Sequence, residues 1–322
     1  MTWKTLPKVE LHLHLEGAAP PSFIRGLAAE KGTDLSEIFK DDGGYAYRDF
    51  EHFLSVYEAA CSVLTGPEEF KRLTQVVLEE LAEQGVVYAE TFVSPDFCGG
   101  GDVGAWREYL AAMQEAQVEG VTLKGIVTCI RHFGPEKGKV AALCAAATQG
   151  DFIRGFGIAG AELMGKPSDF LWSFDCAREA GLHITAHAGE WNDAASVRDA
   201  WQTLGLERIG HGVRATEDPK LVEDLAEAGV TLECCPGSNV FLGVYQKLED
   251  HPIARLRDAG VKVTVSTDDP PFFDTTMTAE YEGLERAFGW GEADFRALNE
   301  TALEAAFCDD ATKARVAKQL EA

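Results

Sequence analysis

The chain has 322 residues, 46% of them hydrophobic, so it is long enough to bury a large core. It carries 53 acidic and 29 basic residues, which gives a formal net charge of −24 at pH 7. A surface this acidic repels phosphate backbones and anionic lipids, which argues against nucleic acid and membrane surfaces as partners.

No targeting segment is recognised at the N-terminus. Residues 1–10 lack the apolar stretch of a signal peptide, and no part of the sequence approaches ~18 consecutive apolar residues. The eight cysteines include no CxxC pair, so they indicate reduced thiols and not a thiolate zinc site. We therefore expect a cytoplasmic protein.

Short apolar runs alternate with helical stretches along the whole chain, which is typical of parallel strands joined by crossover helices. The candidate strands are residues 9–14, 86–92, 121–130, 153–159, 183–187, 208–211, 230–234 and 261–267. Eight is the number that closes a parallel barrel, so the sequence predicts one α/β domain over 1–322, a (β/α)8 TIM barrel. A doubly wound open sheet is the alternative, but no GxGxxG turn follows the first strand.

Amphipathic helices are predicted between the strands, notably at residues 67–84, 102–119, 167–180 and 218–228. The connection between the first two strands is far longer than an ordinary crossover. It contains a helical pattern at 49–64, in which Phe50, Phe53, Leu54 and Tyr57 share one face. Because this insertion follows the C-terminal end of the first strand, we expect it to cover the mouth of the barrel.

Two histidines lie two residues apart on the first strand. His12 and His14 therefore point to the same face, towards the interior of the barrel. Imidazoles in an otherwise apolar strand need a partner that offsets their desolvation, and a metal ion is such a partner. This spacing favours metal binding over a packing role.

Further polar residues stand at the C-terminal ends of other strands, where barrel enzymes place their sites. His187 ends the fifth strand and is followed by Glu190, and His211 ends the sixth. Asp268 and Asp269 end the eighth strand. Glycines beside both histidines would let a ligand's backbone approach closely.

Imidazole and carboxylate ligands suit zinc, and a catalytic zinc keeps a position open for water. The predicted ligands of one Zn²⁺ per chain are His12, His14, His187 and Asp268. Zinc lowers the pKa of a bound water towards ~7. Glu190 is then placed for proton transfer and not for ligation, and His211 for polarising the water.

The remaining polar candidates are assigned surface or packing roles. They are His52, His132, His183 and His251. Glu233, an acid within the seventh strand, is interpreted as pointing to a helix or a neighbour. The Gly99-Gly100-Gly101 stretch lacks the strand–turn–helix context of a phosphate-binding loop.

Taken together, these motifs resemble the signatures of the adenosine/adenine deaminase family. The matching segments are PKVELHLHLEG at 7–17, HAGE at 187–190, RIGHG at 208–212, CPGSN at 235–239 and TDDP at 267–270. The resemblance implies that His12, His14, His187 and Asp268 bind zinc, that Glu190 protonates the purine ring and that His211 orients the attacking water. It further implies that Asp269 bonds purine N7 and that Gly160 presents backbone to N3.

The substrate signals are mixed. Gly160 and Gly210 fit adenosine deaminases, although the acid that usually follows the former is Ala161 here. Glu16 stands where adenosine deaminases carry aspartate, and glutamate there is common among adenine-type relatives. We favour adenosine, converted to inosine and ammonia, with adenine or a modified adenine as the alternative. Glu16 is then expected to face the pocket and set the outer limit of the substrate.

Two other classes are less well supported. A binuclear amidohydrolase would normally carry a carboxylated lysine at the end of the fourth strand, and that strand ends without one. An inactive binding relative would usually have lost a ligand or the acid, and all of them are present.

Overall fold

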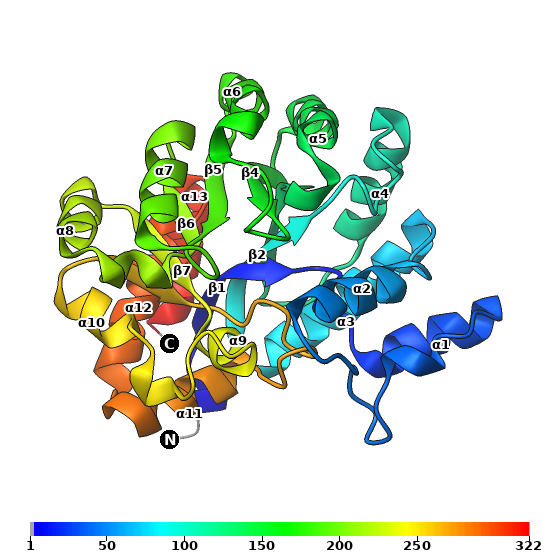
Figure 1. The fold of residues 1–322 in the computed structure, drawn as a ribbon. Helices are drawn as coiled ribbons and strands as arrows, with labels where there is room; N and C mark the ends of the chain where they lie inside the picture. The colour runs from blue at the N-terminus through cyan, green and yellow to red at the C-terminus, as the bar shows by residue number, and fades with distance from the viewer. Residues whose placement is uncertain (1–2, 322) are drawn as a thin grey trace.

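The structure, a computed structural model, describes residues 3–321, and its centre is one eight-stranded parallel sheet (Figure 1). The strands follow one another in chain order around the sheet. They are β1 (Lys8–His14), β2 (Val86–Val93), β3 (Thr122–Ile130), β4 (Ile153–Ala159), β5 (His183–Ala188), β6 (Arg208–His211), β7 (Thr231–Cys234) and β8 (Lys262–Val265). All eight predicted strands are present, with ends that differ by at most two residues.

The sheet closes between its first and last strands. Leu13 pairs with Asp268 in a parallel bridge. The His14 amide donates to the Asp268 carbonyl at 3.0 Å, and the Asp268 amide donates to the His12 carbonyl at 3.1 Å. The protein is therefore a TIM barrel and not an open sheet. The closure also places the polar end of β8 directly beside that of β1.

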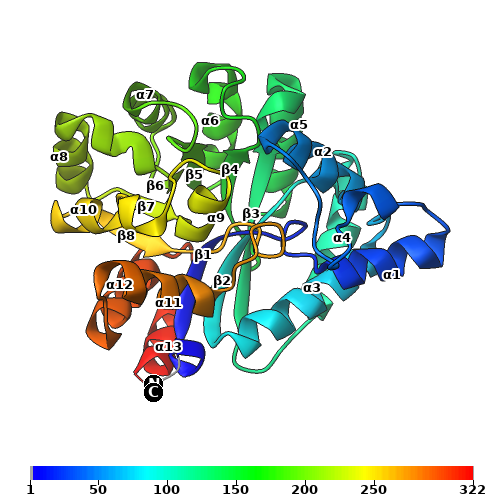
Figure 2. The same cartoon turned by 60° about the horizontal axis from the view of Figure 1, so that its bottom comes forward.

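Helices surround the strands (Figure 2). Those after the insertion are α3 (Pro67–Glu83), α4 (Val103–Glu115), α5 (Pro135–Thr148), α6 (Leu171–Glu179), α7 (Ala194–Leu204), α8 (Pro219–Ala228), α9 (Pro236–Phe241), α10 (Ile253–Asp258), α11 (Met277–Phe288), α12 (Glu292–Ala305) and α13 (Asp310–Leu320). The main core lies between these helices and the strands. Among the described residues, none of the helices is long and apolar enough to cross a membrane.

Two predicted helices were wrong in extent. The helix predicted at 102–119 ends at Glu115, because Ala116 is extended and starts a turn towards β3. The helix predicted at 167–180 is divided into a 3-10 turn, η4 (Pro167–Phe170), and α6. Asp102 is the N-cap of α4 rather than its first residue, since its side chain accepts the Ala105 amide.

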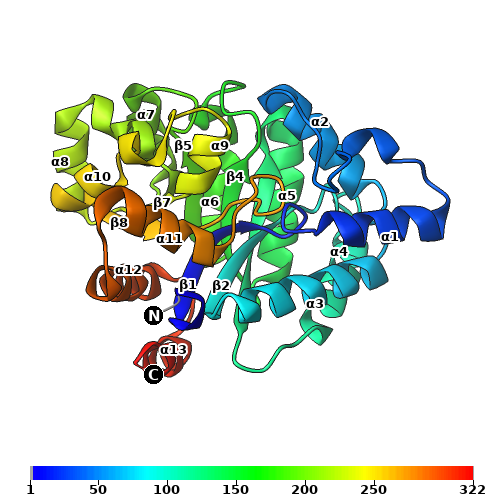
Figure 3. The ribbon, with the colours of Figure 1, turned by 90° about the horizontal axis from the view of Figure 1, so that it is seen from below.

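The insertion after β1 contributes α1 (Pro21–Lys31), the short turn η2 (Ser36–Ile38) and α2 (Phe50–Cys61). Figures 1 and 3 show α1 projecting from one side of the barrel. Asp49 is the N-cap of α2, since its carboxylate accepts the His52 amide, and the helix ends at Cys61, before the predicted end at residue 64. Its apolar face is buried, and Phe53 packs against Phe272 and Phe273 of the loop after β8.

Candidate active site

Four side chains from three strand ends meet at the C-terminal rim of the barrel. His12 and His14 come from β1, His187 from β5, and Asp268 from the residues just after β8. One nitrogen or oxygen atom of each lies within 4.8 Å of those of the others. The structure thus brings together all four residues that the sequence predicts as metal ligands.

The orientation of the imidazoles fits a metal ion. His12 Nδ1 lies 2.7 Å from the Glu233 carboxylate, and its buried Nε2 has no hydrogen-bond partner. His187 Nδ1 donates to the Ile158 carbonyl at 2.9 Å, so its Nε2 is a free lone pair, 3.1 Å from that of His14. The lone pair of His187 Nε2 is free to bind a metal ion, and that of His14 Nε2 is free in the tautomer that carries its proton on Nδ1. Three such nitrogens and one carboxylate are a donor set suited to zinc.

The backbone at the site is strained in two places. His211 and Asp268 have φ angles of 59° and 70°, in the left-handed region that non-glycine residues seldom adopt. Such conformations persist where the surrounding structure enforces them, which is common at functional sites. Ser238 donates to the second oxygen of Asp268 at 2.7 Å and fixes that carboxylate.

Glu190 lies beside the four clustered side chains and not among them. Its carboxyl group is buried, accepts from Asn239 at 3.1 Å and lies 3.8 Å from His211 Nε2. Burial, followed by the negative charges of Asp268 and Glu162, raises the pKa of Glu190 well above its usual range. This shift favours the protonated form of the side chain, which can donate a proton.

These groups open into a small cavity of about 70 Å³. Its floor includes Glu190, His211, Asp269 and Gly160, and its mouth is formed by apolar and aromatic side chains. The mouth residues include Phe50, Phe53, Leu54 and Tyr57 of α2, with Phe97, Leu242 and Phe273. The cavity suits a flat, largely apolar ring with a polar edge directed at the metal cluster.

Asp269 and Gly160 both line the cavity. Burial and the adjacent Asp268 raise the pKa of Asp269 well above its usual range, and its Oδ1 has no partner. Gly17 leaves space for this carboxyl group, because an added Cβ there would lie 1.5 Å from Asp269 Oδ1. Gly160 has a φ of 94° and leaves its backbone against the cavity.

Glu16, which was expected to face the pocket and set the outer limit of the substrate, does not line the cavity, and its contact with the substrate stays a prediction. Its side chain is only 4% exposed and is absent from the cavity wall, where Tyr57 lies instead. The Tyr57 hydroxyl donates to Glu16 Oε2 at 3.4 Å, and Glu16 Oε1 has no partner. Burial raises the pKa of Glu16 to about 7. Glu16 therefore lies behind the tyrosine, because α2 is folded across it.

The role assigned to His132 also needs correction. It lines the cavity, and its Nδ1 accepts the Ala161 amide at 3.3 Å. His251 is fully buried behind the site and contacts Asn239 at 3.2 Å, so its packing role lies one contact away from Glu190. His183, in contrast, pairs with Glu207 at the opposite end of β5.

The glycines beside the histidines leave room for protein atoms. An added Cβ at Gly210 would lie 2.7 Å from the His12 ring, and at Gly189 it would lie 2.2 Å from Val197. At Gly210 the close approach is made by the predicted metal ligands, the His12 ring and the His187 backbone.

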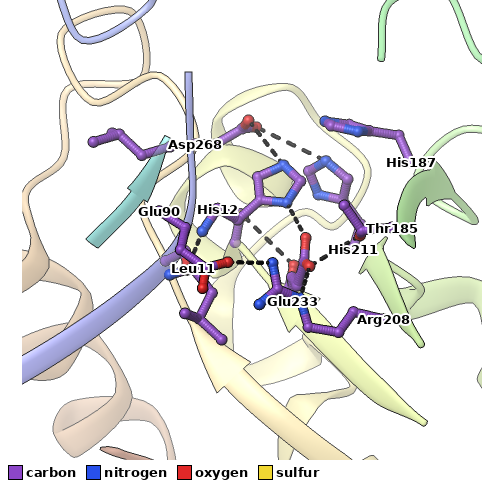
Figure 4. Close-up of polar contacts among 12 residues, drawn as sticks. Leu11, His12, Glu90, Thr185, His187, Arg208, His211, Glu233 and Asp268 are labelled. Atoms are coloured by element: carbon purple, nitrogen blue, oxygen red, sulfur yellow. Dashed lines mark hydrogen bonds and ion pairs between the residues drawn. The ribbon is translucent and has the colours of Figure 1, made fainter. Parts of the chain in front are cut away.

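Sequence reasoning missed the buried polar network beneath the cluster (Figure 4). Glu233 binds His12 through one oxygen, and through the other it accepts from Thr185 at 3.0 Å and from Arg208 at 2.6 Å. Arg208 also pairs with Glu90 at 2.7 Å. By holding the His12 Nδ1 proton, Glu233 leaves Nε2 free for a metal. The alternation of side chains along β7 is the sequence signal from which the inward direction of Glu233 could have been predicted.

Known proteins resemble this chain over nearly its whole length. Residues 7–322 match the family model described as adenosine deaminase. The chain is 47% identical to an adenine deaminase of Rhizobium rhizogenes, over 98% of this chain and 99% of that protein. The crystal structure of adenine deaminase from Arthrobacter aurescens is similar with a TM-score of 0.86 and 30% identity, covering 98% of each chain. An amidohydrolase of Burkholderia ambifaria, solved with bound zinc, has a TM-score of 0.88 and 26% identity, over 99% of this chain and 92% of that one.

Proposed function

The chain belongs to the adenosine deaminase family and is a hydrolytic deaminase, and we propose that it converts free adenine to hypoxanthine and ammonia. The observation that carries this choice is the aromatic wall of the cavity, which includes Tyr57 and not the buried Glu16 that Tyr57 contacts. Adenine is thus preferred over adenosine, the substrate favoured by the sequence motifs alone.

The residues of the site divide into a metal centre and a set of groups that hold the base. We propose that the metal is zinc, which at His12, His14, His187 and Asp268 would supply the Lewis acid that makes water nucleophilic at neutral pH. Glu190 holds the proton that passes to purine N1, and His211, beside it, orients the attacking water. This proton transfer makes C6 electrophilic, so that the oxygen of water adds to it. A proton from that water then passes to the amino group, the C6–N bond breaks to release ammonia, and the C6 carbonyl forms.

The other polar groups orient the ring. Asp269, protonated through its raised pKa, donates a hydrogen bond to N7, and the backbone at Gly160 meets N3. The apolar mouth excludes bulk water, which strengthens each of these contacts. Together they place C6 at the metal centre and direct N9 towards the mouth.

The region around N9 decides between a base and a nucleoside. A ribose on N9 would project towards α2, where Tyr57 and Phe53 line a cavity of about 70 Å³. The Glu16 carboxyl is buried, and its Oε1 has no partner. Because it lies behind Tyr57, a sugar hydroxyl in the cavity would not reach it. A polar group that a substrate cannot reach gives no selectivity for that substrate's hydroxyl.

Relatives named adenine deaminase support the same choice. Proteins named adenine deaminase from Rhizobium rhizogenes and Agrobacterium fabrum are 47% and 43% identical to this chain over nearly its full length. At such identity the residues that line a cavity generally change little. We therefore expect this chain to act on the substrate that its relatives are named for.

A purine panel tests the proposal directly. We expect the kcat/KM for adenine to exceed that for adenosine and deoxyadenosine by about tenfold or more, because the ribose meets the α2 side chains. The measurement is ammonia release, with hypoxanthine and inosine separated by chromatography. A preference for adenosine of the same size would overturn the choice of substrate and leave the deaminase chemistry unaffected.

A pair of variants tests the structural reason. Tyr57→Ala should raise the adenosine-to-adenine ratio of kcat/KM, because it removes a ring of the cavity wall. Tyr57→Phe is the matched control, since it keeps the ring and removes only the hydroxyl that contacts Glu16. If both variants changed the ratio equally, the hydroxyl contact and not the bulk of the ring would determine selectivity.

A further inference from the structure

We propose that Glu162 is a positioning residue for the reaction, in that its carboxylate holds the loop that carries Glu190 in its working place. The inference rests on the proposed role of Glu190 as proton donor. Glu162 follows β4 and Glu190 follows β5, so the contact joins the ends of two neighbouring strands. Neither the sequence motifs nor the relatives' names assign Glu162 a function.

One carboxylate accepts hydrogen bonds from four consecutive backbone amides. Glu162 Oε1 accepts from Gly189 at 2.5 Å, and Oε2 accepts from Glu190, Trp191 and Asn192 at 3.1, 2.7 and 3.2 Å. Successive amides that converge in this way form an anion-binding concavity, which usually takes a phosphate or another external anion. Here the anion is a side chain of the protein itself, and it is only 6% exposed.

The backbone of the loop is shaped for this contact. Gly189 has a φ of 76°, a backbone conformation that glycine adopts readily. Val197 packs against it at the place where a side chain would otherwise lie. Arg131 donates to the His187 carbonyl at 3.0 Å and grips the strand just before the loop. The segment from His187 to Asn192 is therefore held through its backbone N–H groups by Glu162 and through the His187 carbonyl by Arg131.

Glu190 is consequently held at two points. Its amide is bound by Glu162, and its carboxyl group is bound by the Asn239 side chain. A general acid that is displaced by about 1 Å can lose up to ~10² in rate, so a fixed backbone at this residue affects turnover directly. The contact also places a second negative charge near Glu190, which, after burial and Asp268, favours the protonated form.

A purely structural role would have a different signature. If Glu162 only stabilised the fold, its loss would lower the melting temperature and would add to the effect of any active-site change. If it acts through Glu190, its loss matters only while Glu190 can donate a proton. A double-mutant cycle separates the two cases.

The test uses Glu162→Gln in the full-length, metal-loaded enzyme, with and without Glu190→Gln. In the single variant we expect kcat to fall between about tenfold and about 100-fold, with KM nearly unchanged. The amide group of glutamine keeps one acceptor oxygen but presents an NH2 to a backbone N–H. In the Glu190→Gln background the same change should cost less than about twofold.

Glu207→Gln is the matched control. Glu207 also anchors β5 through a backbone amide, that of Ile184 at 3.1 Å, but at the far end of the strand. We expect its kcat to stay within about twofold of the unmodified enzyme. Hydrogen exchange of the amides in residues 189–192 supplies a readout that needs no substrate, and it should accelerate in Glu162→Gln and not in Glu207→Gln.

Two results would overturn the inference. One is an unchanged kcat in Glu162→Gln, and the other is a loss that multiplies fully with that of Glu190→Gln. The cycle can be run on whichever 6-aminopurine the enzyme turns over, so an error in the proposed substrate would not be mistaken for a failure of this inference. If Glu190→Gln itself left turnover intact, the role of Glu190 would be wrong and the inference would fall with it.

Discussion

Carboxyl groups of the same type take opposite protonation states within one cavity. Burial raises the pKa of Glu190 and Asp269 well above their usual ranges, and the Asp268 charge adds to both. Burial acts in the same direction on Asp268, but hydrogen bonds to His12 and His14 outweigh it and hold the pKa of Asp268 well below its usual range. Such a division separates a ligand, which must be ionised, from a proton donor.

The Glu190→Gln variant isolates the proton donor. We expect it to keep its metal and to lose ~10²–10⁴ in turnover, the usual worth of a placed general acid. Because the protonated form is active and its pKa is raised, kcat/KM in the parent enzyme should be full below that pKa and fall as the pH rises through it. The variant should lack this alkaline fall. Loss of metal from Glu190→Gln would instead identify the side chain as a ligand.

At the scale of elements, polar contacts tie separate strands together beneath the metal cluster. Glu233 of β7 reaches His12 of β1, Thr185 of β5 and Arg208 of β6. The parallel register sets these strands side by side, with Gly210 beside Glu233. Gly210 lacks a Cβ that would collide with the His12 ring. The network therefore depends on packing across the barrel and not on any single strand.

The Glu233→Gln variant tests this network. An amide cannot hold the His12 Nδ1 proton as firmly as a carboxylate, so we expect metal affinity to fall about 10–100-fold. Competition with a chromophoric chelator measures the change independently of activity. Glu304→Gln, which removes an exposed ion pair with Lys262, is the control and should bind metal normally. Unchanged affinity in Glu233→Gln would show that His12 is oriented by its packing alone.

At the scale of the whole molecule, the predicted ligands come from strands on opposite sides of the barrel. His12 and His14 lie on β1, next to Asp268 at the closure, whereas His187 lies four strands away on β5. A metal ion bound by all of them would connect these sides through the interior. Metal binding and barrel stability should therefore be linked.

We predict one zinc ion per chain by elemental analysis. Removing it with a chelator should lower the melting temperature, because a ligand present at about 100 times its Kd stabilises the folded state by about 2.7 kcal/mol. His187→Ala should abolish turnover and show no further shift on chelation. Two metal ions per chain, or full activity without any, would contradict the assignment.

Much of the fold and of the metal cluster follows from sequence periodicity. Alternation put His12 and His14 on one face of β1, and the order of eight strands put His187, His211 and Asp268 at the same rim. Both are local properties, because the direction of a side chain along a strand and the end at which a strand stops are set by the nearest residues and by the parallel topology.

The partners of these residues were decided only by the tertiary structure. Whether Glu16 meets the substrate depends on how α2 crosses it, and whether His132 lines the cavity depends on the loop after β4. Glu233 finds His12 across 221 positions of sequence, and Glu162 finds the amides at 189–192 across 27 to 30. Periodicity predicts the face of the strand on which a side chain lies. Contacts between side chains of different strands require the closed barrel, because only closure brings the strand ends together around one point.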